Sequence, residues 1–289
     1  MEESCDRPAP PAAPLPSGKE NVHSSTNASD KLARVFLTRL GIPQLWREDP
    51  ETLWPFLRRT AAPVVLWLAP SAGYGAGRVP ADGGGVVASN HLSAIDPPLV
   101  GALCPRTIYW MAKAELLAMP VVGDILIWTG AFPVRRGLGD RDSLRLAREI
   151  ARDGHMVGIF VEGTRQRLGY PGRVLPGAMM IALQEEVPVV PCGVYSFGWS
   201  RRNRMPCAVV WGDPIDLSGL PRSGRGYKRA VEIVGAEILR LWRFAAEAVA
   251  AGLPDELPDG SRRVPGRYVF FRDASTIPSP STRVKKAAA

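Results

Sequence analysis

The sequence predicts an α/β protein with a mixed, largely parallel sheet flanked by helices and preceded by an N-terminal amphipathic helical segment. From Gly84 onward, short apolar runs alternate with stretches of helical periodicity, which is the pattern of βα units. Several apolar runs lead directly into polar residues, and functional residues of such sheets collect beyond the carboxyl ends of strands. Hydrophobic residues make up 46% and charged residues 22% of the 289 positions, as in a globular protein with a sizeable core.

The predicted elements follow from apolar spacing and from turn residues. Strands are expected at residues 85–89, 107–111, 131–134, 155–161, 187–195 and 207–211. Helices are expected at residues 140–153, 174–186 and about 225–251. A further helix is expected to begin at Pro97 or Pro98, because proline is well tolerated in the first turn and pushes the preceding residue out of the α region.

Composition divides the chain into five parts. Residues 1–30 are rich in Pro, Ala, Ser and Asn and are expected to be a disordered leader. Residues 31–78 are expected to be an amphipathic, interfacial helical segment, and residues 79–220 the α/β domain. Residues 221–252 are expected to form a helix that packs on this domain, and residues 253–289 a basic, loose tail.

Tryptophan and arginine interleave between positions 46 and 67, a composition typical of a membrane interface. The apolar run from Ala61 to Pro70 is shorter than the roughly 20 residues that a bilayer crossing needs, and Pro63 and Pro70 interrupt it. We therefore expect a peripheral protein on the cytoplasmic face of a membrane. The alternative is that the same aromatic side chains pack on the protein's own core.

The formal net charge of +8 indicates an anionic partner, which could be nucleic acid, a phosphorylated substrate or an acidic membrane surface. Nucleic acid is disfavoured, because the arginines do not gather with aromatic residues in any recognised reading element. The four cysteines, Cys5, Cys104, Cys192 and Cys207, are widely spaced and contain no C-x-x-C pair. A zinc cluster and a disulfide framework are therefore not expected, and a reducing, cytosolic setting is.

His91 precedes Asp96 by five positions, and Pro97 follows directly. On a helix, residues five apart are separated by roughly 140° around the axis, so these two side chains could meet only across a turn. If the loop folds back, the Asp96 carboxylate can orient the imidazole and leave its other nitrogen free to accept a proton. The alternative is that Asp96 merely caps a helix and His91 has no catalytic role.

Two further predicted strands end in polar residues. One runs through Gly130 and Phe132 to Arg135 and Arg136, and the other ends in the sequence Glu162, Gly163, Thr164, Arg165. Cations beside a candidate base suggest a pocket for a small phosphorylated alcohol. Each has a simpler explanation, namely a solvated strand end for the paired arginines and a local ion pair between Glu162 and Arg165.

Taken in order, these segments and the stretch from Val187 to Pro191 resemble the four ordered blocks of the glycerolipid acyltransferase family, which includes 1-acylglycerol-3-phosphate acyltransferases. The resemblance covers roughly residues 79–216. It implies that His91 and Asp96 are catalytic. It further implies an acceptor and phosphate site at Gly130, Phe132, Arg136, Glu162, Gly163, Thr164 and Arg165, and an acyl-donor side at Val187, Pro188 and Pro191.

Some positions depart from the family pattern. Val161 stands where the third block usually has proline, Pro133 stands where the second block often has an aliphatic or aromatic residue, and Arg173 or nothing replaces a lysine that often precedes the next helix. The other charged residues of the four blocks are present. The departures therefore bear on which acceptor the protein uses more than on the type of reaction.

The resemblance implies an O-acyltransferase that moves a fatty acyl group from acyl-CoA, or from an acyl carrier, to the hydroxyl of a lysophospholipid. The expected acceptor is 1-acylglycerol-3-phosphate; alternatives are glycerol 3-phosphate, another lysolipid, or a non-catalytic lipid-binding role. No cofactor is implied beyond acyl-CoA as substrate. A phosphoester hydrolase is disfavoured, because no metal cluster or nucleophile motif is visible in the sequence.

Overall fold

The computed structural model describes residues 50–119, 129–134, 141–264 and 285–286, together with Gly123 and Leu126. The helices are α2 (Pro50–Leu68), α3 (Asp96–Leu103), α4 (Ala114–Leu117), α6 (Arg141–Arg152), α7 (Gly177–Glu185) and α8 (Gly224–Ala250), with a 3₁₀ turn at Ala76–Arg78. The strands are β1 (Ser71–Tyr74), β2 (Gly85–Ser89), β3 (Ile108–Lys113), β4 (Phe132–Val134), β5 (Met156–Phe160), β6 (Val189–Tyr195), β7 (Cys207–Trp211), β8 (Ile215–Asp216) and β9 (Lys285–Lys286).

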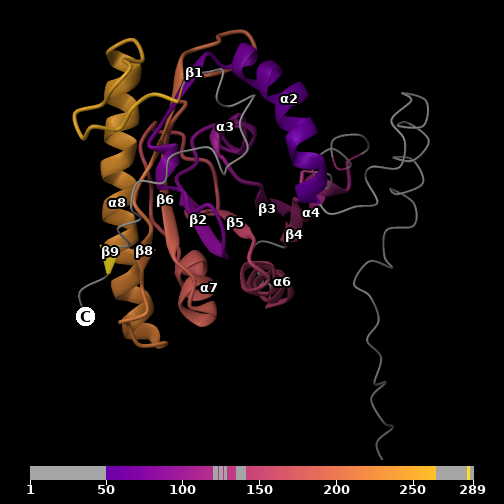
Figure 1. The fold of residues 1–289 in the computed structure, drawn as a ribbon, viewed down its shortest axis with the longest axis vertical. Helices are drawn as coiled ribbons and strands as arrows, with labels where there is room; N and C mark the ends of the chain where they lie inside the picture. The colour runs from indigo at the N-terminus through magenta and orange to yellow at the C-terminus, as the bar shows by residue number, and fades with distance from the viewer. Residues whose placement is uncertain are drawn as a thin grey trace, which may run out of the picture.

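The main sheet has the strand order β1-β7-β6-β2-β5-β3-β4 (Figure 1). Strands β6, β2, β5, β3 and β4 run parallel to one another, whereas β7 is antiparallel to β6 and β1 is parallel to β7. The prediction of a mixed, largely parallel sheet is therefore confirmed. Because β2, β5 and β6 run in one direction, the residues that follow their carboxyl ends meet at a single edge of the sheet, here called the carboxyl edge.

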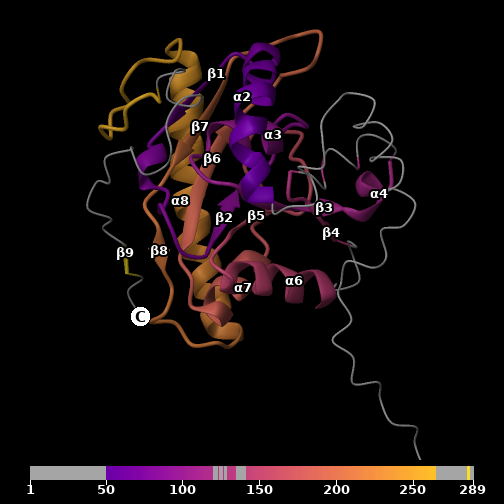
Figure 2. The same ribbon diagram turned by 45° about the vertical axis from the view of Figure 1, so that its right-hand side comes forward.

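Helices cover both faces of the sheet (Figures 1 and 2). Helices α6, α7 and α8 pack on one face, in a buried cluster that includes Val86, Ile159 and Ile238. Helices α2 and α3 pack on the other face, in a cluster that includes Val87 and Leu99. Every residue of β2 is buried, as expected for a parallel strand covered on both sides.

Two predictions for the region before residue 79 need correction. Ser71–Tyr74 is a strand that pairs with β7, so the sheet begins inside the range that we expected to be helical. Pro63 does not interrupt the apolar run, because α2 continues to Leu68. Val65 and Leu66 pack on the α3 side of the core, and this tertiary packing stabilises a helix that its prolines disfavour.

The other predicted elements are present with shifted ends; for example, α7 begins at Gly177 rather than at residue 174, after Pro176. The predicted leader, residues 31–49 of the predicted interfacial segment, and residues 265–284 and 287–289 of the predicted tail lie outside the described residues. Within the described part of the chain, no helix is long and apolar enough to cross a membrane.

The close contact between β6 and α8 depends on Gly193. A methyl group at this position would lie 2.3 Å from the backbone carbonyl carbon of Leu241. We expect Gly193→Ala to lower the free energy of unfolding by roughly 1–3 kcal/mol, because neither backbone can move away without disturbing the packed core. Urea denaturation followed by circular dichroism measures this change.

Gly224→Ala is the matched control, because Gly224 is the first residue of α8 and a methyl group there would meet no heavy atom within 4 Å. The control is expected to be as stable as the unmodified protein or slightly more stable. Equal stability of Gly193→Ala and the control would show that the contact between β6 and α8 is not tight.

Candidate active site

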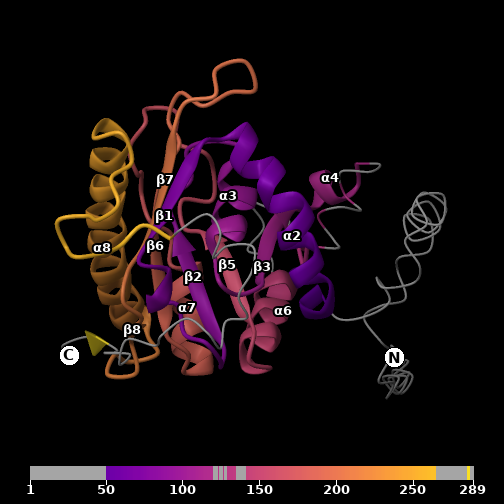
Figure 3. The same ribbon diagram turned by 45° about the horizontal axis from the view of Figure 1, so that its top comes forward.

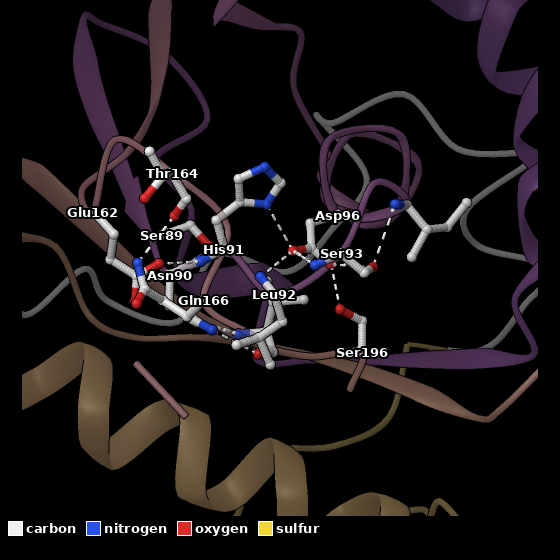
Figure 4. A network of polar contacts seen from close by, with 12 residues as sticks. Ser89, Asn90, His91, Leu92, Ser93, Asp96, Glu162, Thr164, Gln166 and Ser196 are labelled. Atoms are coloured by element: carbon white, nitrogen blue, oxygen red, sulfur yellow. Dashed lines mark hydrogen bonds and ion pairs between the residues drawn. The ribbon is translucent and has the colours of Figure 1, made fainter. Parts of the chain in front are cut away.

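His91 and Asp96 meet across the turn between β2 and α3. The Nδ1 atom of His91 lies 2.8 Å from Oδ2 of Asp96, so the predicted contact is confirmed (Figure 4). A carboxylate can only accept a hydrogen bond, so Nδ1 carries the proton and Nε2 keeps its lone pair. The imidazole is 12% exposed while the Asp96 side chain is fully buried. The site therefore pairs a slightly exposed imidazole with a carboxylate that is shielded from water.

Asp96 accepts hydrogen bonds from four donors besides His91. The backbone N–H groups of Leu92 and Ser93 donate to Oδ2 over 2.6 and 2.9 Å. The hydroxyls of Ser93 and Ser196 donate to Oδ1. A buried negative charge is strongly disfavoured unless it is hydrogen-bonded, and these donors satisfy it. They also leave the carboxylate little freedom to rotate, so the imidazole is held in one orientation.

Aromatic rings fix the plane of the imidazole. The His91 and Phe160 rings stack with centroids 4.1 Å apart and an interplanar angle of 22°. Behind Phe160, the Trp110 ring stacks at 4.7 Å and 11°. Stacking of this kind holds the plane of the imidazole in place.

Asn90 holds the end of β2 against β6. Its amide nitrogen donates to the carbonyl of Val194 over 2.8 Å, and its carbonyl accepts from the N–H of Val194 over 2.8 Å. The regular β2–β6 pairing stops at Ser89 and Cys192, so this side chain extends the pairing beyond the last backbone pair. Asn90 is completely buried and fixes the direction in which the chain leaves the sheet toward His91.

Glu162 connects two loops, while its role in binding the acceptor stays a prediction. Its carboxylate accepts the backbone N–H of His91 over 2.7 Å and that of Gly172 over 2.6 Å. Both oxygens accept backbone N–H groups inside the protein and the residue is 6% exposed, so these contacts give Glu162 a structural role. An ion pair with Arg165, the simpler alternative, is not among the ion pairs of the described residues.

Burial controls the ionisation of Glu162. Removal of the carboxylate from water raises its pKa from 4.5 to about 7, although the two backbone donors act in the opposite direction. The chain can turn sharply after Glu162 because Gly163 adopts a φ of +69°, which favours glycine. The backbone N–H of Gln166 then donates to the carbonyl of His91 over 2.8 Å. The loop of residues 163–176 is thus fastened directly to the His91 backbone.

The other predicted acceptor residues differ in placement. Thr164 and Arg165 are exposed on the loop beside His91, where a substrate could reach them. Gly130 and Phe132 are buried, and the Phe132 ring belongs to the core cluster under α6 and α7, so both positions favour a structural role over ligand contact. Arg136 lies outside the described residues.

The predicted donor-side residues also require correction. Val189 pairs with Val86, so Val187 and Pro188 lie at the amino edge of the sheet. His91 is five residues beyond Val86, so it lies roughly 16 Å along the strand direction from the pair of Val86 and Val189. Pro191 is buried in the middle of β6. These three residues do not face His91, and their positions favour a structural role.

A cavity of about 260 Å³ lies between the loop of residues 163–176 and α8. Its walls are largely apolar and include Val161, Val174, Val231 and Ile238, and Glu162 lies at its boundary. Among the described residues, no group of three or more His, Cys, Asp and Glu side chains is arranged to hold a metal ion.

Ser196, Phe160 and Trp110 were not singled out from the sequence, although all three shape the His91 site. Ser196 follows β6 directly, so the strand-end argument that drew attention to His91 and Glu162 also applied to it. No comparable signal marked Phe160 and Trp110, because their stacking depends on the pairing of β3 with β5.

The raised pKa of Glu162 predicts a pH dependence of stability. The unfolded chain ionises this carboxyl near pH 4.5, whereas the folded protein does so only near pH 7. The contribution of Glu162 to the free energy of unfolding is therefore fully present below pH 4.5 and declines as the pH rises to about 7. In Glu162→Gln this decline is absent, which urea denaturation across this pH range measures.

Glu232→Gln, which removes an exposed carboxylate from α8, is the matched control and is expected to keep the pH dependence of the unmodified protein. The assignment would be wrong if Glu162→Gln and the control showed the same pH dependence.

Comparison with known proteins shows which family this chain resembles. Residues 73–195, which contain all four predicted blocks, match the Acyltransferase family. The 1-acyl-sn-glycerol-3-phosphate acyltransferase of Bacillus subtilis is 31% identical over 158 residues, which cover 53% of this chain and 78% of that relative. The lyso-ornithine lipid O-acyltransferase of Pseudomonas aeruginosa is 37% identical over 178 residues, which cover 57% of this chain and 66% of that relative.

A solved structure shares the fold. The crystal structure of the 1-acyl-sn-glycerophosphate (LPA) acyltransferase PlsC from Thermotoga maritima matches with a TM-score of 0.57 and 22% identity, covering 77% of this chain and 93% of that chain. Coverage of the other relatives is smaller, as for the 1-acyl-sn-glycerol-3-phosphate acyltransferase of Borreliella burgdorferi, of which the chain spans 58%. The family match and the Bacillus subtilis relative show that this chain belongs to the glycerolipid acyltransferase family of the 1-acylglycerol-3-phosphate type, a family of enzymes that transfer acyl groups.

Proposed function

We propose that this protein transfers a fatty acyl group from acyl-CoA to the free hydroxyl of 1-acylglycerol-3-phosphate, as a step of phospholipid biosynthesis, with His91 as general base. The observation that carries the proposal is the 2.8 Å contact between Nδ1 of His91 and the buried Asp96 carboxylate. This contact leaves Nε2 on the opposite side of the ring, pointing away from Asp96 (Figure 4).

The reaction needs two proton transfers, one from the acceptor hydroxyl to His91 and one from His91 to the leaving thiolate. Nε2 of His91 takes the proton of the acceptor hydroxyl while the hydroxyl oxygen attacks the thioester carbonyl carbon. The tetrahedral intermediate then breaks its C–S bond, and the imidazolium returns the proton to the leaving thiolate. Asp96 stabilises the imidazolium between these steps. Base catalysis of this kind contributes roughly 10²–10⁴ in rate, and no acyl-enzyme intermediate is required.

Arg165 and Thr164 are the described residues best placed to hold the acceptor head group. Both are exposed on a loop whose Gln166 N–H donates to the His91 carbonyl, so a phosphate bound there would bring a nearby hydroxyl toward the imidazole. Arg136, which lies outside the described residues, remains a second predicted ligand of the acceptor phosphate.

A second acceptor has specific support. The identity to the lyso-ornithine lipid O-acyltransferase, 37%, is higher than the 31% to the Bacillus subtilis relative. An acceptor with an ornithine head group would depend less on a phosphate-binding arginine than lysophosphatidic acid does. The donor is proposed to be acyl-CoA, with an acyl carrier protein as the alternative, and the protein is proposed to act at the cytoplasmic face of a membrane without any cofactor.

His91→Ala is expected to lower kcat by roughly 10²–10⁴-fold, because the acceptor hydroxyl loses its base. The measurement is thioester-dependent acylation of lysophosphatidic acid, followed by mass spectrometry of the lipid product, with lyso-ornithine lipid supplied in a parallel reaction. Similar rates for His91→Ala and the unmodified protein would end the general-base proposal.

His155→Ala is the matched control, since His155 lies just before β5 and outside the His91 site. It is expected to keep most of the activity. Absence of acyl transfer in the unmodified protein with either acceptor would favour a lipid-binding role without catalysis.

Arg165→Ala is expected to raise the KM for lysophosphatidic acid by about tenfold or more, because a charge-assisted hydrogen bond to phosphate contributes roughly 1.5–3 kcal/mol. The KM for acyl-CoA is expected to stay unchanged. Steady-state kinetics with each substrate varied in turn separates the two constants. A rise confined to the KM for acyl-CoA would mean that the acceptor and donor sites are assigned in reverse.

A further inference from the structure

Exposed apolar side chains gather at the carboxyl edge of the sheet. Trp67 is 65% exposed, Leu168 72% and Phe197 45%, although such side chains are usually buried in a protein that faces only water. They belong to three segments, which are the end of α2, the loop of residues 163–176 and the loop of residues 196–206. The exposed apolar side chains used in this argument are Val64, Trp67, Leu168, Tyr170, Phe197 and Met205.

Contacts join the three segments into one surface. The indole nitrogen of Trp199 donates to the carbonyl of Leu68 over 3.0 Å, which ties the loop of residues 196–206 to the end of α2. The guanidinium of Arg204 lies 4.5 Å from the ring centre of Trp67. The Phe197 ring lies so close to Gly169 that a methyl group there would approach it to 2.9 Å. Figures 2 and 3 show the β6–β7 connection, which contains residues 196–206, rising beside the end of α2 that leads into β1.

The same surface is strongly basic. The two loops contain no Asp or Glu, and they contain the six arginines Arg165, Arg167, Arg173, Arg201, Arg202 and Arg204. All six are exposed. Arginine alternates with apolar residues, as at Arg167 and Leu168 or at Arg204 and Met205. An acidic protein surface would match the charge but offers no apolar interior for the aromatic side chains, whereas an anionic bilayer offers both.

We propose that this surface, here called the docking face, binds an anionic lipid bilayer. The docking face consists of residues 64–68, 163–176 and 196–206. Phe197, Leu168 and Trp67 enter the boundary between head groups and acyl chains, and the arginines bind lipid phosphates at the rim.

Docking in this orientation has a consequence for the proposed reaction. The Gln166 N–H that donates to the His91 carbonyl belongs to one of the docking loops, so the bilayer surface and the imidazole lie at the same edge of the sheet. A lysolipid would then reach His91 with its acyl chain still in the bilayer. This consequence rests on the proposed function, whereas the docking itself does not.

The test is co-sedimentation of the full chain with vesicles, in the absence of acyl donor. The vesicles contain phosphatidylcholine alone or phosphatidylcholine with about one third phosphatidylglycerol. Binding to the anionic vesicles is expected to be tighter and to weaken with added salt. The double variant Arg201→Ala, Arg202→Ala is expected to bind about twenty-five-fold more weakly, at roughly fivefold for each guanidinium. Leu168→Ser with Phe197→Ser is expected to weaken binding about tenfold or more.

The matched control lies in the first turns of α8, outside the docking face. Arg225→Ala with Lys228→Ala removes the same charge from exposed positions there. This control is expected to bind like the unmodified protein. Equal binding by the docking and control variants, or no binding of the unmodified protein to anionic vesicles, would overturn the proposal.

A short-chain lysophosphatidic acid below its critical micelle concentration is a soluble substrate and needs no bilayer. Its turnover therefore tests the proposed reaction independently of membrane docking. The Arg201→Ala, Arg202→Ala variant is expected to keep that turnover while losing vesicle binding, because neither arginine is among the residues assigned to the His91 site or to the acceptor head group. Vesicle binding without turnover in the unmodified protein would contradict the reaction and leave the docking face supported.

Discussion

The buried carboxylate of Asp96 is the constraint on which the site depends. A fully buried negative charge must be hydrogen-bonded, and the donors here come from two places in the chain. Leu92 and Ser93 provide backbone N–H groups from the turn after β2, Ser196 provides a hydroxyl from the end of β6, and His91 provides its ring N–H. The turn, α3 and β6 must therefore meet at one point, and the imidazole orientation follows from that meeting.

Parallel pairing explains why these groups converge. The carboxyl ends of β2, β5 and β6 place His91, Glu162 and Ser196 at one edge. The backbone N–H of His91 donates to Glu162, while the His91 ring and the Ser196 hydroxyl both donate to Asp96. Glu162 joins the turn after β2 to the loop of residues 163–176, because its carboxylate accepts the backbone N–H groups of His91 and Gly172. The same edge carries the exposed arginines and aromatic residues of the docking face, which brings the proposed base and the proposed bilayer surface together.

The sequence was sufficient for the sheet type, for most strands and for the contact between His91 and Asp96, because all of these follow from local periodicity and from turn chemistry. It was insufficient where the conformation or burial of a segment depends on contacts with residues far away in the sequence. Strand β1 contains only four residues, and pairing with β7 decides its conformation. The burial of Phe132 and the placement of Val187 at the amino edge follow from strand register, which a single sequence does not reveal.

The central claim is that Asp96 holds His91 in one tautomer, with the proton on Nδ1 and a free lone pair on Nε2. The most direct measurement is ¹⁵N NMR of the imidazole in histidine-labelled protein, since the chain has only three histidines and His91→Ala assigns the signals. At neutral pH the account predicts a protonated Nδ1 and an unprotonated Nε2 for His91. A proton on Nε2, or averaged shifts for the two nitrogens, would contradict it.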